Sequence, residues 1–360
     1  MSTLGRRDTV RALVVAAGLD ALVVTYPTNV RYLCGFTGSN GAVLIGADPR
    51  HDRLATDFRY LTQAAAESPG IEVLVERSVT PALVAFAAGG GANRVGYEAD
   101  DWRVLTYESI RALHGELDLV ATSGLVEGLR RVKDDDEIAA LTEACRISDV
   151  ALAAVLGEVR VGMTERAIAR RLESLMLDAG ADAISFETIV ATGPHSAIPH
   201  HAPTGRPVAA GDFLKIDFGA EYAGYHADET RTFVVGAEPE PWQREIHDLV
   251  RIAQQAGVDA LAVGADVRDV DHASRSIIAA AGHGEHFGHG LGHGVGLDIH
   301  EAPMIGYAAT GILSDRTPVT VEPGVYLPGR GGVRIEDTLV VRTGGPVSLT
   351  STTRDLLVLG

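Results

Sequence analysis

The sequence predicts a protein of two domains, an α/β domain followed by an α+β domain. Up to about residue 125, short apolar runs alternate with helix-forming segments, which is the pattern of a sheet covered by helices. The pattern changes near Asp134, where an acidic run begins a long stretch with helical apolar periodicity. After it, helices followed by a β-hairpin occur twice. We therefore expect domains of residues 1–125 and 126–360, with an internal pseudo-twofold repeat in the second.

In the first domain, helix and strand signals are separated by glycine-rich and polar segments. This order of elements predicts a mixed or parallel sheet. Helices are expected at residues 6–17, 58–67, 82–88 and 102–114, and strands at 21–25, 42–45, 71–75, 94–97 and 117–120.

The second domain is expected to begin with two long helices. The acids from Asp134 onward suit a helix N-terminus, and the apolar pattern continues to about Gly157. Thr164 is a good N-cap for the next helix, and Gly180 stands where a helix commonly stops. The further elements are a strand at 186–192 and helices at 242–263 and 267–282.

The first hairpin of this domain carries two aspartates. Residues 214–222 alternate apolar with polar or small residues, which predicts a half-buried strand with Asp217 on its polar face. A turn at Ala223-Gly and a β-rich run over 225–235 predict a returning antiparallel strand. A two-residue loop places Asp228 on the same face as Asp217, one diagonal step away. A three-residue loop would place the two aspartates on opposite faces.

The second hairpin carries two glutamates. Residues 319–327 and 333–341 are β-rich, and a Pro-Gly-Arg-Gly-Gly loop separates them. A loop centred on Gly329 places Glu322 directly across from Glu336. The Pro-Gly pair that follows Glu322 predicts a bulge or an edge, an irregularity that re-aims side chains.

Between these hairpins lies a segment with glycine at every second position from 288 to 296. So much glycine disfavours a helix. The His289-x-x-x-His293 spacing is therefore not the helical zinc pair, which also needs a glutamate after the first histidine. We expect an extended strand with His289, Leu291, His293 and Val295 on one face, approached on the other by backbone or substrate.

Four carboxylates and one imidazole from these segments suit a pair of divalent metal ions. Carboxylates in one pocket repel each other and would take up protons, whereas two divalent cations cancel four negative charges. One aspartate in a strand is more often structural, so the hypothesis depends on all five occurring together. Oxygen-rich ligation favours manganese, while the histidine also tolerates cobalt, zinc or iron. The five residues are Asp217, Asp228, His293, Glu322 and Glu336.

Composition limits the classes of partner and the compartment. With 360 residues, 46% hydrophobic and 22% charged, the chain is expected to be an ordinary soluble globular protein. A net charge of −17 argues against a nucleic-acid partner. No apolar run approaches the roughly 18 to 20 residues of a membrane span, and the N-terminus does not resemble a signal peptide. Cys34 and Cys145 are expected as buried free thiols in a reducing cytoplasm.

Five ordered motifs resemble those of the pita-bread metallopeptidases of family M24, which include aminopeptidase P, prolidase, methionine aminopeptidase and creatinase. Methionine aminopeptidases lack the creatinase-type N-terminal domain, which Asn29-Val-Arg-Tyr-Leu-Cys-Gly-Phe-Thr-Gly-Ser resembles. The expected fold is thus a creatinase-like α/β domain and a pita-bread catalytic domain. The motifs are Ile216-Asp-Phe-Gly-Ala, Asp228-Glu-Thr-Arg-Thr, His289-Gly-Leu-Gly-His-Gly-Val-Gly, Val321-Glu-Pro-Gly-Val-Tyr and Arg334-Ile-Glu-Asp.

The resemblance implies roles for particular residues. It makes the five ligand-type residues the metal ligands, and creatinase, which keeps the fold without them, a poor match. His200 is expected near the scissile carbonyl, and His289 and His300 against the substrate. The oxyanion is expected to be held by metal and by His200 or His300. Glu322 is our candidate for taking the proton of the attacking water. Arg334 is expected to support the metal cluster and to contribute to substrate binding.

The implied activity is that of an exopeptidase with two metal ions that hydrolyses Xaa-Pro bonds. Met304 stands where some prolidases carry an arginine for the dipeptide carboxylate, so we expect an Xaa-Pro aminopeptidase, with an Xaa-Pro dipeptidase as the alternative. A metal-binding or scaffold protein without catalysis is a further alternative. The expected substrates are small peptides with proline at the second position, and the resemblance implies a homodimer. Two further departures are His195, where relatives often have asparagine, and the doubled His200-His.

Other polar residues are interpreted as structural. Tyr326 lies two strand steps from Glu322, so it either reaches the site or only packs. The residues expected in loops or on the surface are His195, His201, His283 and His286, and those expected outside the ligand set are Glu285, Asp298, Glu301 and Asp337.

Overall fold

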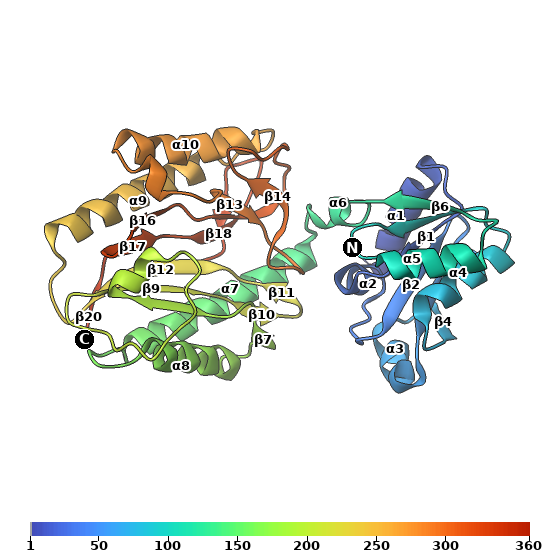
Figure 1. The fold of residues 1–360 in the computed structure, drawn as a ribbon, viewed down its shortest axis with the longest axis horizontal. Helices are drawn as coiled ribbons and strands as arrows, with labels where there is room; N and C mark the ends of the chain where they lie inside the picture. The colour runs from blue at the N-terminus through green and yellow to red at the C-terminus, as the bar shows by residue number, and fades with distance from the viewer. Residues whose placement is uncertain (1) are drawn as a thin grey trace. The chain divides into compact units, whose positions relative to one another are not determined.

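The computed structural model describes residues 2–360 and divides into two compact units, one ending at Arg130 and the other spanning Arg131–Gly360 (Figure 1). The short helix α6 (Glu127–Arg130) closes the first unit. The domain limits inferred from the sequence, 1–125 and 126–360, stay a prediction. None of the helices among the described residues is long and apolar enough to cross a membrane.

The first unit is built on a six-stranded sheet in the order β4-β3-β2-β1-β5-β6. Strand β1 pairs antiparallel with β2 and parallel with β5, which confirms the predicted mixed sheet. The strands are β1 (Ala21–Val24), β2 (Gly41–Gly46), β3 (Arg53–Thr56), β4 (Glu72–Val75), β5 (Arg94–Glu98) and β6 (Asp118–Thr122). The other helices are α1 (Thr3–Ala16), α2 (Pro27–Cys34), α3 (Leu61–Glu67), α4 (Val79–Gly89) and α5 (Val104–Leu113).

The sequence analysis missed α2 and β3. Helix α2 begins with Pro27 in its first turn and ends at Gly35, whose φ of 85° is left-handed. A helix of only eight residues shows little apolar periodicity, and the proline and glycine at its two ends are also typical of a loop. Strand β3 has four residues and begins with Arg53, too few for a period of two to stand out.

The second unit contains four long helices, and two of them begin where the sequence predicts, at the acidic run of α7 and at the N-cap Thr164 of α8. Asp134 and Glu137 form a reciprocal capping box at α7, and the Thr164 side chain accepts from the Ala167 N–H at α8. These contacts satisfy N–H groups that a helix start leaves without partners. The helices are α7 (Asp135–Leu156), α8 (Glu165–Asp178), α9 (Pro241–Asp259) and α10 (Val267–Ala280).

The strands of the second unit form four sheets. Their orders are β20-β12-β9-β8, β14-β13-β15-β18-β19, β11-β10-β7 and β16-β17. The strands are β7 (Ala183–Ile184), β8 (Ile189–Thr192), β9 (Phe213–Phe218), β10 (Ala220–Tyr222), β11 (Tyr225–His226), β12 (Glu229–Val235), β13 (Gly292–Gly294), β14 (Glu301–Ile305), β15 (Pro318–Val321), β16 (Gly324–Leu327), β17 (Gly331–Arg334), β18 (Asp337–Val340), β19 (Val347–Ser348) and β20 (Val358–Leu359).

Both predicted hairpins have the expected register. Tyr222 pairs with Tyr225 across a two-residue loop, and positive φ angles at both loop residues, 51° and 82°, match a type I′ turn. In the second hairpin, the pairs Val321 with Asp337 and Gly324 with Arg334 bracket the two glutamates. The ladder is interrupted between those pairs, at the predicted irregularity after Glu322.

Within the glycine-rich segment only residues 292–294 form a strand, with a register shift after His293 and bends at 289, 291 and 296, so the predicted extended strand is confined to these three residues. A Cβ atom at Gly292 would lie 2.0 Å from the Thr320 carbonyl oxygen, so neighbouring backbone does approach as predicted. The prediction of one shared face is wrong, because Leu291 packs in the hydrophobic core whereas His289 and His293 line a cavity.

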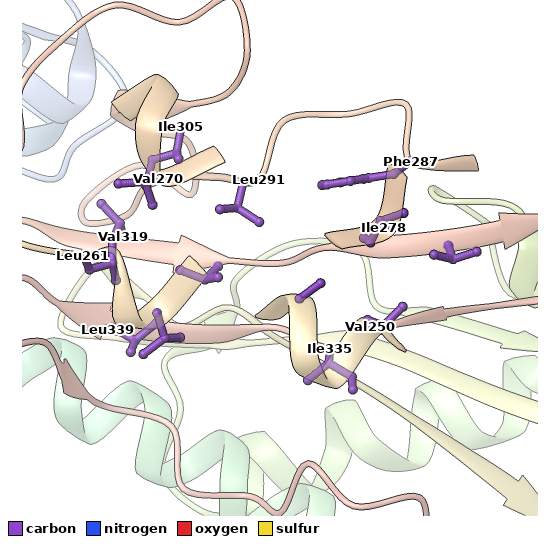
Figure 2. Packing of buried hydrophobic residues seen from close by; sticks show 14 of the residues in the cluster. Val250, Leu261, Val270, Ile278, Phe287, Leu291, Ile305, Val319, Ile335 and Leu339 are labelled. Carbon is purple, nitrogen blue, oxygen red and sulfur yellow. The ribbon is translucent and has the colours of Figure 1, made fainter. Parts of the chain in front are cut away.

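Each helix pair of the second unit packs on its own strands. Val250 of α9 and Val270 of α10 pack in one cluster with Leu291, just before β13, and with Val319 of β15 (Figure 2). Helices α7 and α8 cover a separate cluster on β8, β9 and β12. The strands that carry the ligand-type residues therefore pack against two hydrophobic cores. The internal repeat inferred from the sequence stays a prediction.

The close backbone approach at Gly292 leads to a stability prediction. Gly292→Ala is expected to destabilise the protein by about 1–3 kcal/mol or more, because the added methyl group meets a rigid carbonyl. Thermal and chemical unfolding measure the change. Gly288→Ala is the matched control, since a Cβ there has no heavy atom within 4 Å. Equal stability of the two variants would contradict the prediction.

Candidate functional site

The five ligand-type residues lie around one cavity of about 310 Å³. Asp217 comes from β9, Asp228 from the residue before β12, and His293 from β13. Glu322 lies between β15 and β16, and Glu336 lies between β17 and β18. The two hairpins and the glycine-rich strand thus bring together residues that are far apart in the sequence.

The ligand atoms are close enough to share metal ions. One atom each of Asp228, His293 and Glu336 lies within 4.8 Å of the others. His293 Nε2 is 3.4 Å from Asp228 Oδ2 and 3.6 Å from Glu322 Oε1. Its Nδ1 lies 3.0 Å from the Gly294 carbonyl oxygen, to which it can donate. That hydrogen bond would leave Nε2 as the nitrogen available to a metal ion.

Burial and mutual repulsion make this cluster unfavourable without bound cations. Burial, followed by the charges of neighbouring carboxylates, raises the pKa of Glu336 well above its usual value. Burial also raises the pKa of Asp228 to about 6 and that of Glu322 to about 7. Burial alone would lower the pKa of His293, but Asp228 and Glu322 outweigh it and raise this pKa to about 9. The cluster therefore fits divalent cations, which restore the charge balance.

Asp217 gives a second sign that the site fits a cation. Its Oδ1 atom is buried and has no hydrogen-bond partner among residues 2–360. Its Oδ2 atom accepts a hydrogen bond from Arg334. A buried carboxylate oxygen without a partner is costly, and a metal ion would supply the missing interaction.

Arg334 is a buried residue that donates hydrogen bonds to Asp217 and to its neighbours. Only 2% of its surface is exposed. Besides Asp217, it donates to Thr230 Oγ1 at 3.0 Å and to Tyr326 Oη at 2.8 Å. Thr230 Oγ1 in turn donates to Glu336 Oε2 at 2.7 Å. The guanidinium lines a cavity but already has these partners, so its expected role in substrate binding stays a prediction.

Behind the cluster, Asp337 faces away from the cavity, as the alternation along the strand predicts. It accepts hydrogen bonds from Arg231 at 2.7 Å, Gln254 at 2.8 Å and Thr350 at 2.7 Å. Arg231 also donates to the backbone carbonyl of Glu336. This buried network fixes the backbone that presents Glu336.

A second cavity of about 710 Å³ lies beside the first. His200, His293 and Glu322 line both cavities. The larger cavity has mostly small or apolar walls, and Met304 and Tyr307 are exposed there, at 50% and 68%. A substrate at the ligand cluster therefore has space on two sides.

His289 lies in the larger cavity with both ring nitrogens engaged. Nδ1 is 2.8 Å from the Gly290 carbonyl oxygen, and Nε2 is 2.9 Å from Tyr326 Oη. Burial, followed by the charge of Arg334, lowers the pKa of His289 to about 4. The neutral ring can donate from Nδ1 and accept at Nε2, which leaves the ring face for a substrate. The sequence analysis left the role of Tyr326 open, and the structure places it in this network.

His200 and His300 are both exposed, and both line the smaller cavity. The His300 ring centre is 4.4 Å from that of His293. Burial of part of its surface, followed by the charge of His293, lowers the pKa of His300. All the residues that the sequence analysis singled out for catalysis or substrate binding thus lie at one or both cavities, and their roles stay predictions.

Lys215 is a residue that the sequence analysis missed. It is fully buried, donates to the carbonyl of Ile198 at 2.7 Å and lies 5.0 Å from the Tyr326 ring centre. It thereby helps to fix the segment that carries His200. Its position two residues before Asp217 puts it on the same strand face, which was the available signal.

Glu165, His195 and His201 form another group that could hold a metal ion. Glu165 is fully buried, and its two oxygens lie 2.9 Å from His195 Nδ1 and 2.9 Å from His201 Nε2. Two ligands of a tetrahedral zinc ion, each about 2.1 Å from it, would lie about 3.4 Å apart. The shorter distances are those of direct hydrogen bonds.

Further contacts support hydrogen bonding at Glu165. Its carboxylate also accepts from the backbone N–H groups of Thr192 and Thr204, at 2.9 and 3.0 Å. His201 lies in a loop but is buried rather than on the surface, and His195 lies in a short 3-10 helix (Gly193–Ala197), so the sequence-based expectation of loop or surface histidines holds only in part. Glu165 ties together the two ends of the segment that carries His200. No sequence pattern predicts these contacts of Glu165, because an acid in a first helical turn is common.

Glu165 leads to a second stability prediction. Burial alone would raise its pKa, but hydrogen bonds from Thr204 and His201 outweigh it and lower the pKa to about 2. The stabilisation is therefore complete above the ordinary value of 4.5 and is lost as the pH falls towards 2. Glu165→Gln should cost about 1–3 kcal/mol at neutral pH, because buried donors lose a charged acceptor.

Chemical denaturation between pH 2 and 7 tests this. Glu158→Gln is the control, because its ion pair with Arg171 is exposed and should contribute at most about 1 kcal/mol. An equal loss in both variants, or a Glu165→Gln effect that does not shrink at low pH, would contradict the role of the buried carboxylate.

Comparisons with known proteins identify the family of the chain. The model of metallopeptidase family M24 matches residues 139–343, and that of the creatinase/prolidase N-terminal domain matches residues 6–132. The chain is 42% identical over 340 residues to the Xaa-Pro dipeptidase of Pyrococcus furiosus, covering 94% of this chain and 95% of that protein. A solved Xaa-Pro dipeptidase from Bacillus anthracis matches with a TM-score of 0.94 at 37% identity, covering 99% of this chain and 100% of that one. An X-Pro aminopeptidase from Thermotoga maritima matches with a TM-score of 0.91 at 34% identity, covering 98% of this chain and 99% of that one.

Proposed function

Because the chain belongs to metallopeptidase family M24 and carries a creatinase/prolidase N-terminal domain, we propose that it is an Xaa-Pro dipeptidase. The observation that carries this proposal is a complete set of ligand-type residues beside two cavities, in a chain 42% identical to a named Xaa-Pro dipeptidase. The sequence-based preference for an aminopeptidase depended on Met304 alone. The named relatives favour the dipeptidase, which was the alternative.

We assign Asp217, Asp228, His293, Glu322 and Glu336 as ligands of two divalent metal ions, with manganese preferred for this oxygen-rich set. When bound, such ions lower the pKa of water and polarise the scissile carbonyl. The protein contributes a buried set of ligand atoms. Arg334 orients the Asp217 carboxylate, and Arg231 orients the backbone of Glu336. Such support from outside the ligand set keeps the donors oriented.

Glu322 is suited to move the proton. It is the least buried of the five, with 18% of its side chain exposed, and it lines both cavities. A carboxylate there can accept the proton of the attacking water and pass it to the proline nitrogen as the bond breaks. His200 also lines both cavities, where its imidazole can donate to the oxyanion that forms on the carbonyl.

Charge supports one orientation of the dipeptide. Arg334 lines the larger cavity, whereas no lysine or arginine lines the smaller one among the described residues. The ammonium group of a zwitterionic dipeptide is therefore expected in the smaller cavity and the proline carboxylate in the larger one. The apolar walls of the larger cavity suit the proline ring.

Substitution of individual residues tests the assignment of the five metal ligands. Asp228→Ala and Glu336→Ala should each abolish hydrolysis of Ala-Pro and lower the bound metal from two ions to at most one. Elemental analysis and a dipeptide assay measure both quantities. Glu285→Gln, at an exposed carboxylate outside both cavities, is the control and should keep both. Full activity in either alanine variant would refute the two-metal proposal, and metal binding without any peptidase activity would favour a binding protein.

The volume of the larger cavity is also compatible with a second candidate function, that of an Xaa-Pro aminopeptidase. A volume of about 710 Å³ exceeds the needs of proline, and the exposed Met304 brings no charge for a terminal carboxylate. Manganese-loaded protein should nevertheless cleave Ala-Pro with a kcat/KM at least about tenfold above that for Ala-Pro-Ala, about 1.4 kcal/mol of discrimination. Faster cleavage of the tripeptide would establish the aminopeptidase instead.

A further inference from the structure

Glu187 is a carboxylate in the smaller cavity that belongs to no cluster. It lies just before β8, is exposed, and lines the cavity together with Phe186 and Ile189. Within residues 2–360 its side chain has no hydrogen-bond or ion-pair partner. Most other acids on this wall are held in place, as Asp217 is by Arg334. Glu187 is therefore free to interact with whatever enters the cavity.

Charge balance makes Glu187 distinctive once metal ions are bound. Two divalent cations offset the four carboxylates of the ligand set, which also line this cavity. Glu187 is then the one lining carboxylate left without a counter-charge, among the residues that the structure describes. No lysine or arginine lines this cavity in the described chain. An uncompensated negative charge at the edge of a binding cavity favours a cationic group on the ligand.

Apolar walls of the same cavity suit the aliphatic part of a long cationic side chain. Phe186, Ile189 and Ile299 are apolar, and the cavity of about 310 Å³ has room for a lysine or arginine side chain. Such side chains place an aliphatic stem along apolar surface and keep the charged end near water or a carboxylate. An exposed carboxylate beside apolar walls matches both parts.

We propose that Glu187 is a specificity-determining residue that selects substrates whose N-terminal residue is lysine or arginine. The inference rests on the proposed function, in which the N-terminal residue occupies the smaller cavity and proline the larger one. Because the ion pair forms in the bound state before and during the reaction, its effect should fall on KM more than on kcat. A partly exposed ion pair corresponds to about a fivefold preference at low salt.

The test compares Lys-Pro with norleucine-Pro, which has a similar stem without the charge. The wild-type enzyme should show a kcat/KM about fivefold higher for Lys-Pro at low salt, and 0.5 M salt should reduce the ratio. In Glu187→Gln the ratio should fall to about one and lose its salt dependence. In Glu187→Lys the enzyme should prefer Glu-Pro to Lys-Pro. Asp178→Asn removes an exposed charge at the end of α8, outside the cavity, and should leave the wild-type ratio unchanged.

Other results would overturn the inference. An unchanged Lys-Pro to norleucine-Pro ratio in Glu187→Gln overturns the inference. An equal loss for both substrates also overturns it, because Glu187 would then bind the terminal ammonium group common to both. If the wild-type enzyme hydrolyses neither dipeptide although Ala-Pro-Ala is cleaved, the dipeptidase proposal fails, and Lys-Pro-Ala against norleucine-Pro-Ala tests Glu187 in the same way. Melting temperatures show whether each variant is folded.

Discussion

Repulsion among four carboxylates buried around one imidazole is the constraint on which the second unit depends. Burial and neighbouring negative charge raise the pKa of Glu336 well above its ordinary range, and Asp217 keeps a buried oxygen without a partner. A fold that brings such groups together is stable only if cations enter or the groups take up protons. The two hydrophobic cores on which the ligand-bearing strands rest offset part of this cost.

Arginines in the layer beneath convert this costly cluster into a defined site. Arg334 joins Asp217, Thr230 and Tyr326, and Arg231 joins Asp337 to the backbone of Glu336. Guanidinium groups donate several hydrogen bonds in a fixed plane, so each one orients several partners at once. Arg334 and Arg231 therefore orient Asp217 and the backbone of Glu336 within the cluster.

Two clusters of carboxylates and histidines differ in the nitrogen-to-oxygen distances within them. Around His293, nitrogen-to-oxygen distances of 3.4 and 3.6 Å leave room for an ion between the groups. Around Glu165, two distances of 2.9 Å are direct hydrogen bonds that tie the His200 segment to the start of α8. The same residue types thus suit metal ligation in one place and position a loop in the other, and composition alone does not distinguish the two clusters.

The sequence by itself determined both hairpin registers, the start of α7 and the N-cap of α8, and it predicted which residue types gather at the cavity. These follow from local rules, since a two-residue turn fixes which residues face each other and a capping box marks a helix start. It did not reveal the short elements α2 and β3, the separate environment of Leu291, or the contacts of Glu165 and Lys215. Only the tertiary structure decided those, and with them the two cavities and the place of Glu187 beside the ligands. Such features depend on chain segments far apart in sequence, whose approach no local periodicity encodes.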